Sequence, residues 1–179
     1  MKLHIRFIKS LYSIKSIAQF RFLGVGSTIL YVLLLTLLCI FPVLIVFILS
    51  LMSDQQTLKN FENYGLNPDQ MQEFASSLDG IFPIIVAVIY MVMYILFSGI
   101  LFSGVSLIAG CAIPVSNIIG KRLSYRHLWV ISCYSITLPS VLLTILFTFN
   151  VHIPFSFFWF WLFSFIICVL AIKKIPAKK

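Results

Sequence analysis

Long apolar runs alternate with short charged segments along the chain. Three runs contain no Asp, Glu, Lys or Arg, and they extend from Leu23 to Ser53, from Gly80 to Gly120 and from His127 to Ile172. About 20 apolar residues are enough for a helix to cross a hydrocarbon core about 30 Å thick. The pattern therefore predicts an all-α polytopic membrane protein, in which residues 1–179 form a single membrane domain.

The runs divide into four predicted transmembrane helices, at residues 28–52, 81–103, 129–149 and 154–172. The third and fourth are joined only by Asn150 to Ile153, and so short a connection makes them an antiparallel hairpin. The fourth opens with a cluster of aromatic residues, namely Phe155, Phe157, Phe158, Trp159, Phe160 and Trp161. Such a cluster at the end of a span is typical of the membrane interface.

The second apolar run is too long for one crossing of the membrane. At about 1.5 Å per residue, a helix from Ile81 to Ile119 would measure about twice the thickness of the hydrocarbon core. Splitting it near Ser98 would place the later basic segments outside, against the charge rule for membrane proteins. We therefore expect one span at 81–103, continued as a helix to about residue 119 that leaves the membrane or lies along its inner surface. A five-span arrangement is the alternative.

Charge is divided between the loops. All acidic residues fall in one loop at 53–80, where Ser53, Gly65 and the Asn67-Pro68 pair are start and stop signals that predict two short helices. The basic residues flank the spans, in the N-terminal segment, at Lys121 to Arg126 and in the tail at 173–179. Basic segments stay in the cytoplasm, so both termini are expected inside and the acidic loop outside. The net charge of +8 thus reflects membrane anchoring, and no nucleic-acid partner is expected.

The first 22 residues predict an amphipathic helix that lies along the inner surface of the membrane. Its apolar face consists of Leu3, Phe7, Leu11, Ile14, Ala18 and Phe22, and its opposite face of Lys2, Arg6, Lys9, Ser13 and Ser16. The cations expected to meet anionic lipid heads are Lys2, Arg6, Lys9, Lys15 and Arg21. Each basic residue near an anionic surface contributes about 1 kcal/mol. The alternative is a docking helix for a cytoplasmic partner.

Small residues recur along the second long segment. Gly99, Ser103, Ser106 and Gly110 follow one another at spacings of four, three and four, with Asn117 on the same helical face. In lipid, small side chains let helix backbones approach closely. This face is therefore expected to be the main helix-packing seam, or a seam for another membrane protein or a second copy of the chain.

The apolar runs contain hydroxyl groups, but their sequence does not predict a catalytic or metal-binding group of residues. Ser132, Ser135, Thr137, Ser140 and Thr144 give the third span a polar set that can hydrogen-bond across the bundle. No ionisable Asp, Glu, Lys or Arg lies within a span, so a proton relay and a carboxylate pair are both missing. The histidines lie far apart and the cysteines form no C-x-x-C pair. Neither catalysis, nor a cofactor, nor a metal site is expected.

Two segments resemble a known bacterial family. Ser10 to Phe22, leading through Gly24 and Gly26 into Thr28 to Val32, resembles the opening of the Gram-positive membrane family called domain of unknown function 1189. A second match contains Ser124, Tyr125 and Arg126, followed by Thr137 and Pro139, and the same Ser-Tyr-Arg and Pro pattern is more loosely similar to Yip1-type proteins. The resemblance implies a bacterial plasma membrane protein. Some members are labelled maltodextrin utilisation proteins, and typical members are expected to have a longer outer loop.

Two function classes follow from these patterns. The first is a non-catalytic accessory or assembly protein that binds another membrane component through the small-residue seam, the basic N-terminal helix and the acidic loop. That component would belong to a carbohydrate-uptake or envelope complex. The second is a small oligomeric transporter, channel or lipid-handling protein, in which the hydroxyl-bearing third span and the seam line a pathway. A dry bundle with exposed small-residue grooves favours the first, and a continuous polar cavity the second.

Overall fold

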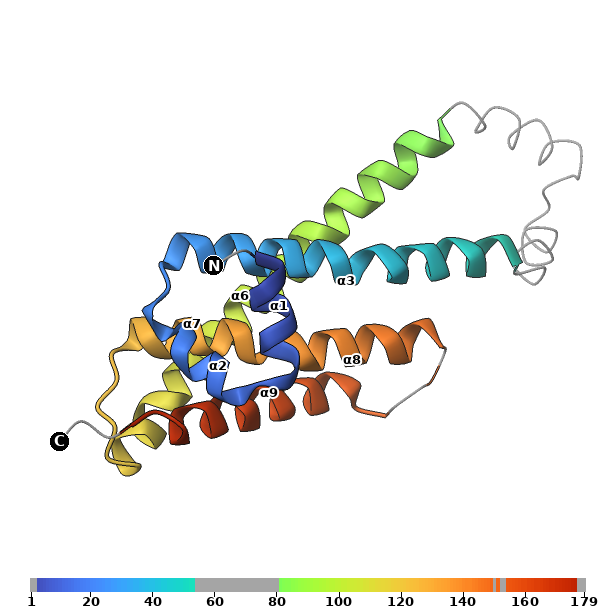
Figure 1. The fold of residues 1–179 in the computed structure, drawn as a ribbon. Helices are drawn as coiled ribbons and strands as arrows, with labels where there is room; N and C mark the ends of the chain where they lie inside the picture. The colour runs from blue at the N-terminus through green and yellow to red at the C-terminus, as the bar shows by residue number, and fades with distance from the viewer. Residues whose placement is uncertain (1–2, 54–80, 150, 152–153, 177–179) are drawn as a thin grey trace, which may run out of the picture.

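The architecture was analysed in a computed structural model that describes residues 3–53, 81–149, 151 and 154–176. All regular elements in these ranges are helical (Figure 1). They are α1 (Leu3–Tyr12), α2 (Ile14–Gln19), the 3-10 helix η1 (Phe20–Phe22), α3 (Val25–Ser53), α6 (Phe82–Ile118), α7 (Tyr125–Ser135), α8 (Thr137–Thr148) and α9 (Ser156–Lys173). The two short helices expected in the acidic loop lie outside the described residues.

Four helical segments are long and apolar enough to cross a membrane: Val25–Val46, Ile84–Ile118, Tyr125–Thr148 and Ser156–Lys173. This confirms the expected all-α fold with four potential spans. The ends of α3, α7 and α9 that carry basic flanking residues lie at the same end of the bundle (Figure 1). We call it the basic end.

Helix α6 runs without a break from Phe82 to Ile118, through Pro114. It lies obliquely to α3, α8 and α9, so its N-terminal part diverges from the bundle while its C-terminal part packs against it (Figure 1). A tilted helix can exceed the thickness of the hydrocarbon core, because tilting shortens the distance that it spans. The long second run is therefore one continuous helix.

The third span is two helices in series. Helix α7 ends at Ser135, Ile136 lies between the two, and α8 begins at Thr137. Pro139 explains the interruption, because it has no N–H to donate to the carbonyl of Ser135, and its ring crowds that carbonyl. The segment from Val130 to Thr137 is buried throughout, so the break lies in the centre of the bundle.

The N-terminal segment forms two helices, which corrects the expectation of a single helix over the first 22 residues. It is broken at Ser13, whose backbone is extended and whose side chain accepts a hydrogen bond from the N–H of Ser16 at the start of α2. The two helices fold back against the bundle, α1 on α8 and α2 on α7 and α9. The faces are also rotated from the expected ones, since Arg6 is buried and Phe22 is 74% exposed.

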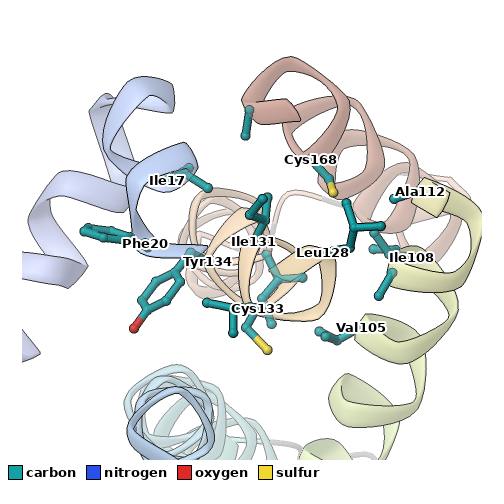
Figure 2. Packing of buried hydrophobic residues seen from close by; sticks show 14 of the residues in the cluster. Ile17, Phe20, Val105, Ile108, Ala112, Leu128, Ile131, Cys133, Tyr134 and Cys168 are labelled. Carbon is teal, nitrogen blue, oxygen red and sulfur yellow. The ribbon is translucent and has the colours of Figure 1, made fainter. Parts of the chain in front are cut away.

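The core surrounds α7 (Figure 2). Leu128, Ile131 and Tyr134 of α7 are fully buried, and residues of the N-terminal segment, α6 and α9 pack around them. The rings of Phe20 and Tyr31 lie 4.7 and 4.5 Å from the ring of Tyr134. The N-terminal segment is therefore part of the core of the bundle.

Candidate functional site

An open apolar groove runs between α6 and α9. It encloses about 620 Å³ and is lined by Gly99, Ile100, Ser103, Gly104, Leu107, Ile108, Cys111, Phe157, Trp161 and Phe165. Within it the Trp161 ring lies directly against Gly104, because a methyl group at Gly104 would lie 1.9 Å from the nearest ring carbon of Trp161. One wall thus presents small residues and the other presents aromatic rings.

The small residues predicted as a seam do not form the inner packing face of α6. Gly99, Ser103, Gly110 and Asn117 are exposed, and atoms from other parts of the structure are absent around a methyl group built on Gly99 or Gly110. The residues that pack inward lie beside them on the helix: Gly104, Val105, Ile108, Ala109, Ala112 and Ser116. The expectation that the seam packs the bundle internally is therefore wrong, because apolar and small residues one position along make that contact.

The residues of the predicted seam also have different surroundings. Gly99 and Ser103 line the groove, whereas Asn117 lines a second cavity at the basic end. Ser106 faces α7, where its hydroxyl oxygen accepts a hydrogen bond from the indole N–H of Trp129 at 3.3 Å. Sequence reasoning missed Gly104, because its importance depends on the opposing indole of Trp161, which spacing along one helix does not reveal.

Of the predicted hydroxyl set, Ser132, Ser135, Thr137 and Ser140 are buried and Thr144 is half-buried. The Thr137 hydroxyl belongs to a hydrogen-bonded relay across the bundle. The Tyr31 hydroxyl lies 2.7 Å from the Thr137 hydroxyl and 3.0 Å from that of Ser10. Ser132 reaches the thiol of Cys168 on α9 at 3.5 Å. The relay joins α1, α3 and α8, so it holds the N-terminal segment against the spans.

Two further hydroxyls of this set, on Ser135 and Thr144, bond within their own helices and also contact the thiols of Cys168 and Cys39 on other helices. Ser135 and Thr144 donate to backbone carbonyls one turn earlier in their own helices. The Ser140 and Tyr134 hydroxyls are buried without a hydrogen-bond partner among the described residues. Figure 2 shows the Tyr134 hydroxyl pointing out of the apolar cluster, away from Ile131 and Leu128. The set therefore contributes mainly to the packing of the bundle.

The turn between α6 and α7 organises the basic end. Gly120 has a φ of 77°, and the N–H groups of Gly120 and Lys121 donate to the carbonyls of Asn117 and Ser116. This is the Schellman arrangement that closes many helices. Burial, together with the nearby charge of Arg21, lowers the pKa of the Lys121 ammonium group.

The Lys121 ammonium group also connects this turn to the last span. It donates to the carbonyl oxygens of Ile172, at 2.9 Å, and of Lys173, in the last turn of α9. A cation at the C-terminal end of a helix is favoured by the helix dipole. The turn is thereby fastened to the end of α9.

The positions that carried the family resemblance lie at the two ends of α7 and just beyond. Ser124 precedes α7, and its hydroxyl lies 2.9 Å from Nδ1 of His127. Tyr125 and Arg126 are exposed in the first turn of α7. Thr137 and Pro139 lie at the break between α7 and α8. These positions define the start and the bend of the third span.

The predicted lipid-facing cations have different environments. Lys2 lies outside the described residues, Lys15 is exposed, and Lys9 and Arg21 are half-buried. Arg6 is buried and donates a hydrogen bond to the Ser27 hydroxyl. Arg6 therefore faces the bundle, contrary to the prediction that it faces lipid heads.

Chemistry-bearing residues remain dispersed in the part of the chain that the structure describes. Its residues include no group of three or more His, Cys, Asp or Glu that could hold a metal ion. Cys133 and Cys168 are free and buried, while Cys111 is free and exposed beside the groove. The features with room for a partner or ligand are thus the α6–α9 groove and the cavity at the basic end.

The fold and these surfaces define an all-α protein with four helices of membrane-spanning length. The family model described as protein of unknown function (DUF1189) matches residues 5–60 and 52–172, so the chain belongs to this family. The two matched segments overlap in the acidic loop. Neither a curated protein nor a solved structure matches the chain. The resemblance to the family is thereby confirmed, and the looser likeness to Yip1-type proteins stays a prediction.

Proposed function

We propose that this protein is a non-catalytic accessory or assembly protein of the bacterial plasma membrane, with both termini in the cytoplasm. In this proposal, the α6–α9 groove binds a transmembrane helix of another membrane protein. A link to carbohydrate uptake or the cell envelope rests on the label given to some family members. The orientation rests on the basic residues, which gather at one end of the spans.

The observation that carries the proposal is the exposure of Gly99 and Ser103 in the groove. Small residues at a helix surface allow a second helix to approach closely and gain dispersion contacts. Among the residues that the structure describes, no other helix packs closely on Gly99, and Ser103 is exposed, because α6 packs through its neighbouring face. The rings of Phe157 and Phe165 extend the apolar surface on the other wall, so a helix placed in the groove would contact both α6 and α9.

The test is photocrosslinking in native membranes, with a photoreactive residue at Ser103. The matched control is the same residue at Leu142, which is also apolar in its surroundings and 52% exposed but lies on α8. We expect Ser103 to capture a defined transmembrane segment of one membrane protein, identified by mass spectrometry of the linked peptide, and Leu142 to capture lipid.

A blocking variant makes this test specific. Gly99→Leu should fill the groove and remove the crosslink from Ser103, without lowering the thermal stability of the chain, because a methyl group at Gly99 meets no neighbour. Capture of lipid alone from both positions would refute the proposal. Capture of a second copy of the chain would replace the partner by self-association.

The second candidate is an oligomeric transporter, channel or lipid-handling protein. The unpartnered buried hydroxyls of Tyr134 and Ser140 favour it, because such groups in a membrane bundle can mark a hydrated passage. Flux measurements in proteoliposomes decide between the two candidates. Solute or lipid transfer that is lost in Ser140→Ala would support this second candidate over the first.

A further inference from the structure

The cavity at the basic end is amphipathic and cationic. It encloses about 870 Å³ and is lined by Ile113, Asn117, Gly120, Arg122, Leu123 and Ser124. Ile113 and Leu123 supply an apolar part, whereas Asn117, Arg122 and Ser124 supply hydrogen-bonding groups. Gly120 lies between them without a side chain, and a methyl group there would meet open space.

The charge around this cavity is unbalanced. Lys121, Arg122 and Arg126 lie together in the α6–α7 turn and the start of α7, and Arg21 is close enough to affect the pKa of Lys121. None of the residues that the structure describes is acidic. Cationic side chains that lie together without neighbouring carboxylates repel one another, and an anion from outside the chain would reduce that repulsion.

The two exposed arginines differ in their setting. The side chain of Lys121 is already engaged with the end of α9. Arg122 lines the cavity, while Arg126 is exposed outside it. A guanidinium group binds a phosphate through paired, charge-assisted hydrogen bonds, so its position in a cavity allows recognition beyond simple attraction.

The cavity lies at a boundary between apolar and charged surface, and this position favours a lipid anion over a free one. The apolar stretch of α6 ends at Ile118 and that of α7 resumes at Leu128, so the turn between them lies at a boundary between apolar and charged surface. Basic residues at such boundaries lie among lipid headgroups. A free phosphate ion would use only the polar part of the cavity, whereas a phospholipid would use the apolar part as well.

We propose that this cavity binds the phosphate group of an anionic phospholipid, with Arg122 as its principal ligand. Asn117 and Ser124 hydrogen-bond the headgroup, and Ile113 and Leu123 contact the glycerol and the first carbons of the acyl chains. The site is separate from the α6–α9 groove, so it does not depend on the proposed partner. It also differs from the N-terminal cations, because it is an open hollow that places apolar side chains beside Arg122.

The experiment uses the full chain in nanodiscs of phosphatidylcholine mixed with phosphatidylglycerol. Native mass spectrometry measures the phosphatidylglycerol that remains bound after release from the disc. Arg122→Gln should lower this retention about tenfold, the size expected for losing a charge-assisted hydrogen bond. Arg126→Gln removes the same charge outside the cavity and should change the retention less than about twofold.

Two further arms decide the source of the phosphate. Leu123→Asn should weaken phosphatidylglycerol retention, because it removes the apolar contact. Inorganic phosphate added to discs of phosphatidylcholine alone should show no binding that depends on Arg122, and in the mixed discs it should not displace phosphatidylglycerol. Arg122→Lys keeps the charge but loses the paired geometry, and it should retain an intermediate amount of lipid.

Each contrary result overturns a part of the reasoning. Equal losses from Arg122→Gln and Arg126→Gln would mean that diffuse surface charge holds the lipid. Unchanged retention in Arg122→Gln, in a variant with unaltered thermal unfolding, would refute the site. Binding of inorganic phosphate that depends on Arg122 and displaces the lipid would assign the cavity to a soluble phosphate compound.

Discussion

Tyr31 and Tyr134 form a natural matched pair for testing how the N-terminal segment is held. Their rings are 4.5 Å apart and both side chains are buried. The Tyr31 hydroxyl joins Ser10 to Thr137, at 3.0 and 2.7 Å. The Tyr134 hydroxyl has no hydrogen-bond partner in the described part of the chain. Removing each hydroxyl by substitution with Phe therefore separates hydrogen bonding from ring packing.

Tyr31→Phe is expected to lower the free energy of unfolding, whereas Tyr134→Phe is expected to leave it unchanged or raise it. Tyr31→Phe removes two buried hydrogen bonds, each of which contributes about 0.6 kcal/mol on average within a membrane protein and at most about 1.7 kcal/mol. The Thr137 hydroxyl also loses its partner, whereas Ser10 can still donate to the Phe7 carbonyl at 2.8 Å. We expect the free energy of unfolding to fall by about 1 to 2 kcal/mol. Tyr134→Phe removes a desolvated, unpaired hydroxyl, so it should leave the stability unchanged or raise it by up to about 1 kcal/mol.

The assay is reversible unfolding of the full chain in mixed micelles, followed by tryptophan fluorescence. Limited proteolysis with trypsin supplies a second readout, because Lys9 and Lys15 lie in the segment that the relay holds. Tyr31→Phe should increase the rate of cleavage at these sites about five- to tenfold if it weakens docking by about 1 to 1.4 kcal/mol. Tyr134→Phe should leave that rate unchanged. Equal destabilisation by the two substitutions would refute the reasoning, because the relay would then carry no special role.

Three other changes test packing, the turn and charge. Gly104→Ala should lower the free energy of unfolding by about 1 to 3 kcal/mol through its clash with Trp161, and the additional change Trp161→Phe should recover part of this loss in the same unfolding assay. Gly120→Ala should lower the free energy of unfolding by about 1 to 2 kcal/mol, because an alanine is strained at a φ of 77°. An unchanged midpoint of the unfolding transition would contradict the Schellman arrangement at this turn. Arg21→Gln should raise the pKa of Lys121 in an NMR titration, since burial and the Arg21 charge both lower it.

The sign of the Lys121 effect has a further consequence for pH dependence. The lowered pKa of Lys121 means that desolvation and the Arg21 charge together outweigh the contacts of its ammonium group with the α9 carbonyls, so the charged form opposes folding at pH values below the folded pKa. The opposition is relieved as the pH rises through the lowered pKa. Arg21→Gln removes one of the two causes, so it should flatten the dependence of stability on alkaline pH, as measured by unfolding at a series of pH values.

The transmembrane helices were predictable because many apolar residues together indicate each of them. A run of about 20 apolar residues leaves few alternatives in a membrane protein, so the helices at residues 25–46 and 156–173 could be located from sequence. The continuity of α6 was harder to predict from the sequence, because the tilt of a helix depends on its contacts with the other helices rather than on the hydropathy of the run itself. Pro139 is visible in the sequence, but its effect on α7 and α8 depends on whether neighbouring helices compensate for the missing donor.

The faces of helices were harder to predict than their positions. Arg6 fits the polar face of an isolated amphipathic helix, yet the fold gives it a buried place near Ser27. The seam at Gly99 and Ser103 has the spacing of a packing face, yet Gly104 makes the close contact. Both errors have the same physical origin. Spacing along one helix defines a stripe, but the partner that covers the stripe comes from a distant part of the chain.

The docking of the N-terminal segment also constrains the order in which the chain matures. Helix α2 packs on α7 and α9, and the relay from Ser10 ends at Thr137. This segment therefore meets its binding surface only after α7, α8 and α9, which follow it far along the chain, have been translated and inserted. Until then residues 3–22 have basic and apolar faces but no protein surface to cover, which suits a temporary residence on the lipid surface. We therefore expect these residues to lie on the lipid surface during biogenesis, before the fold is complete.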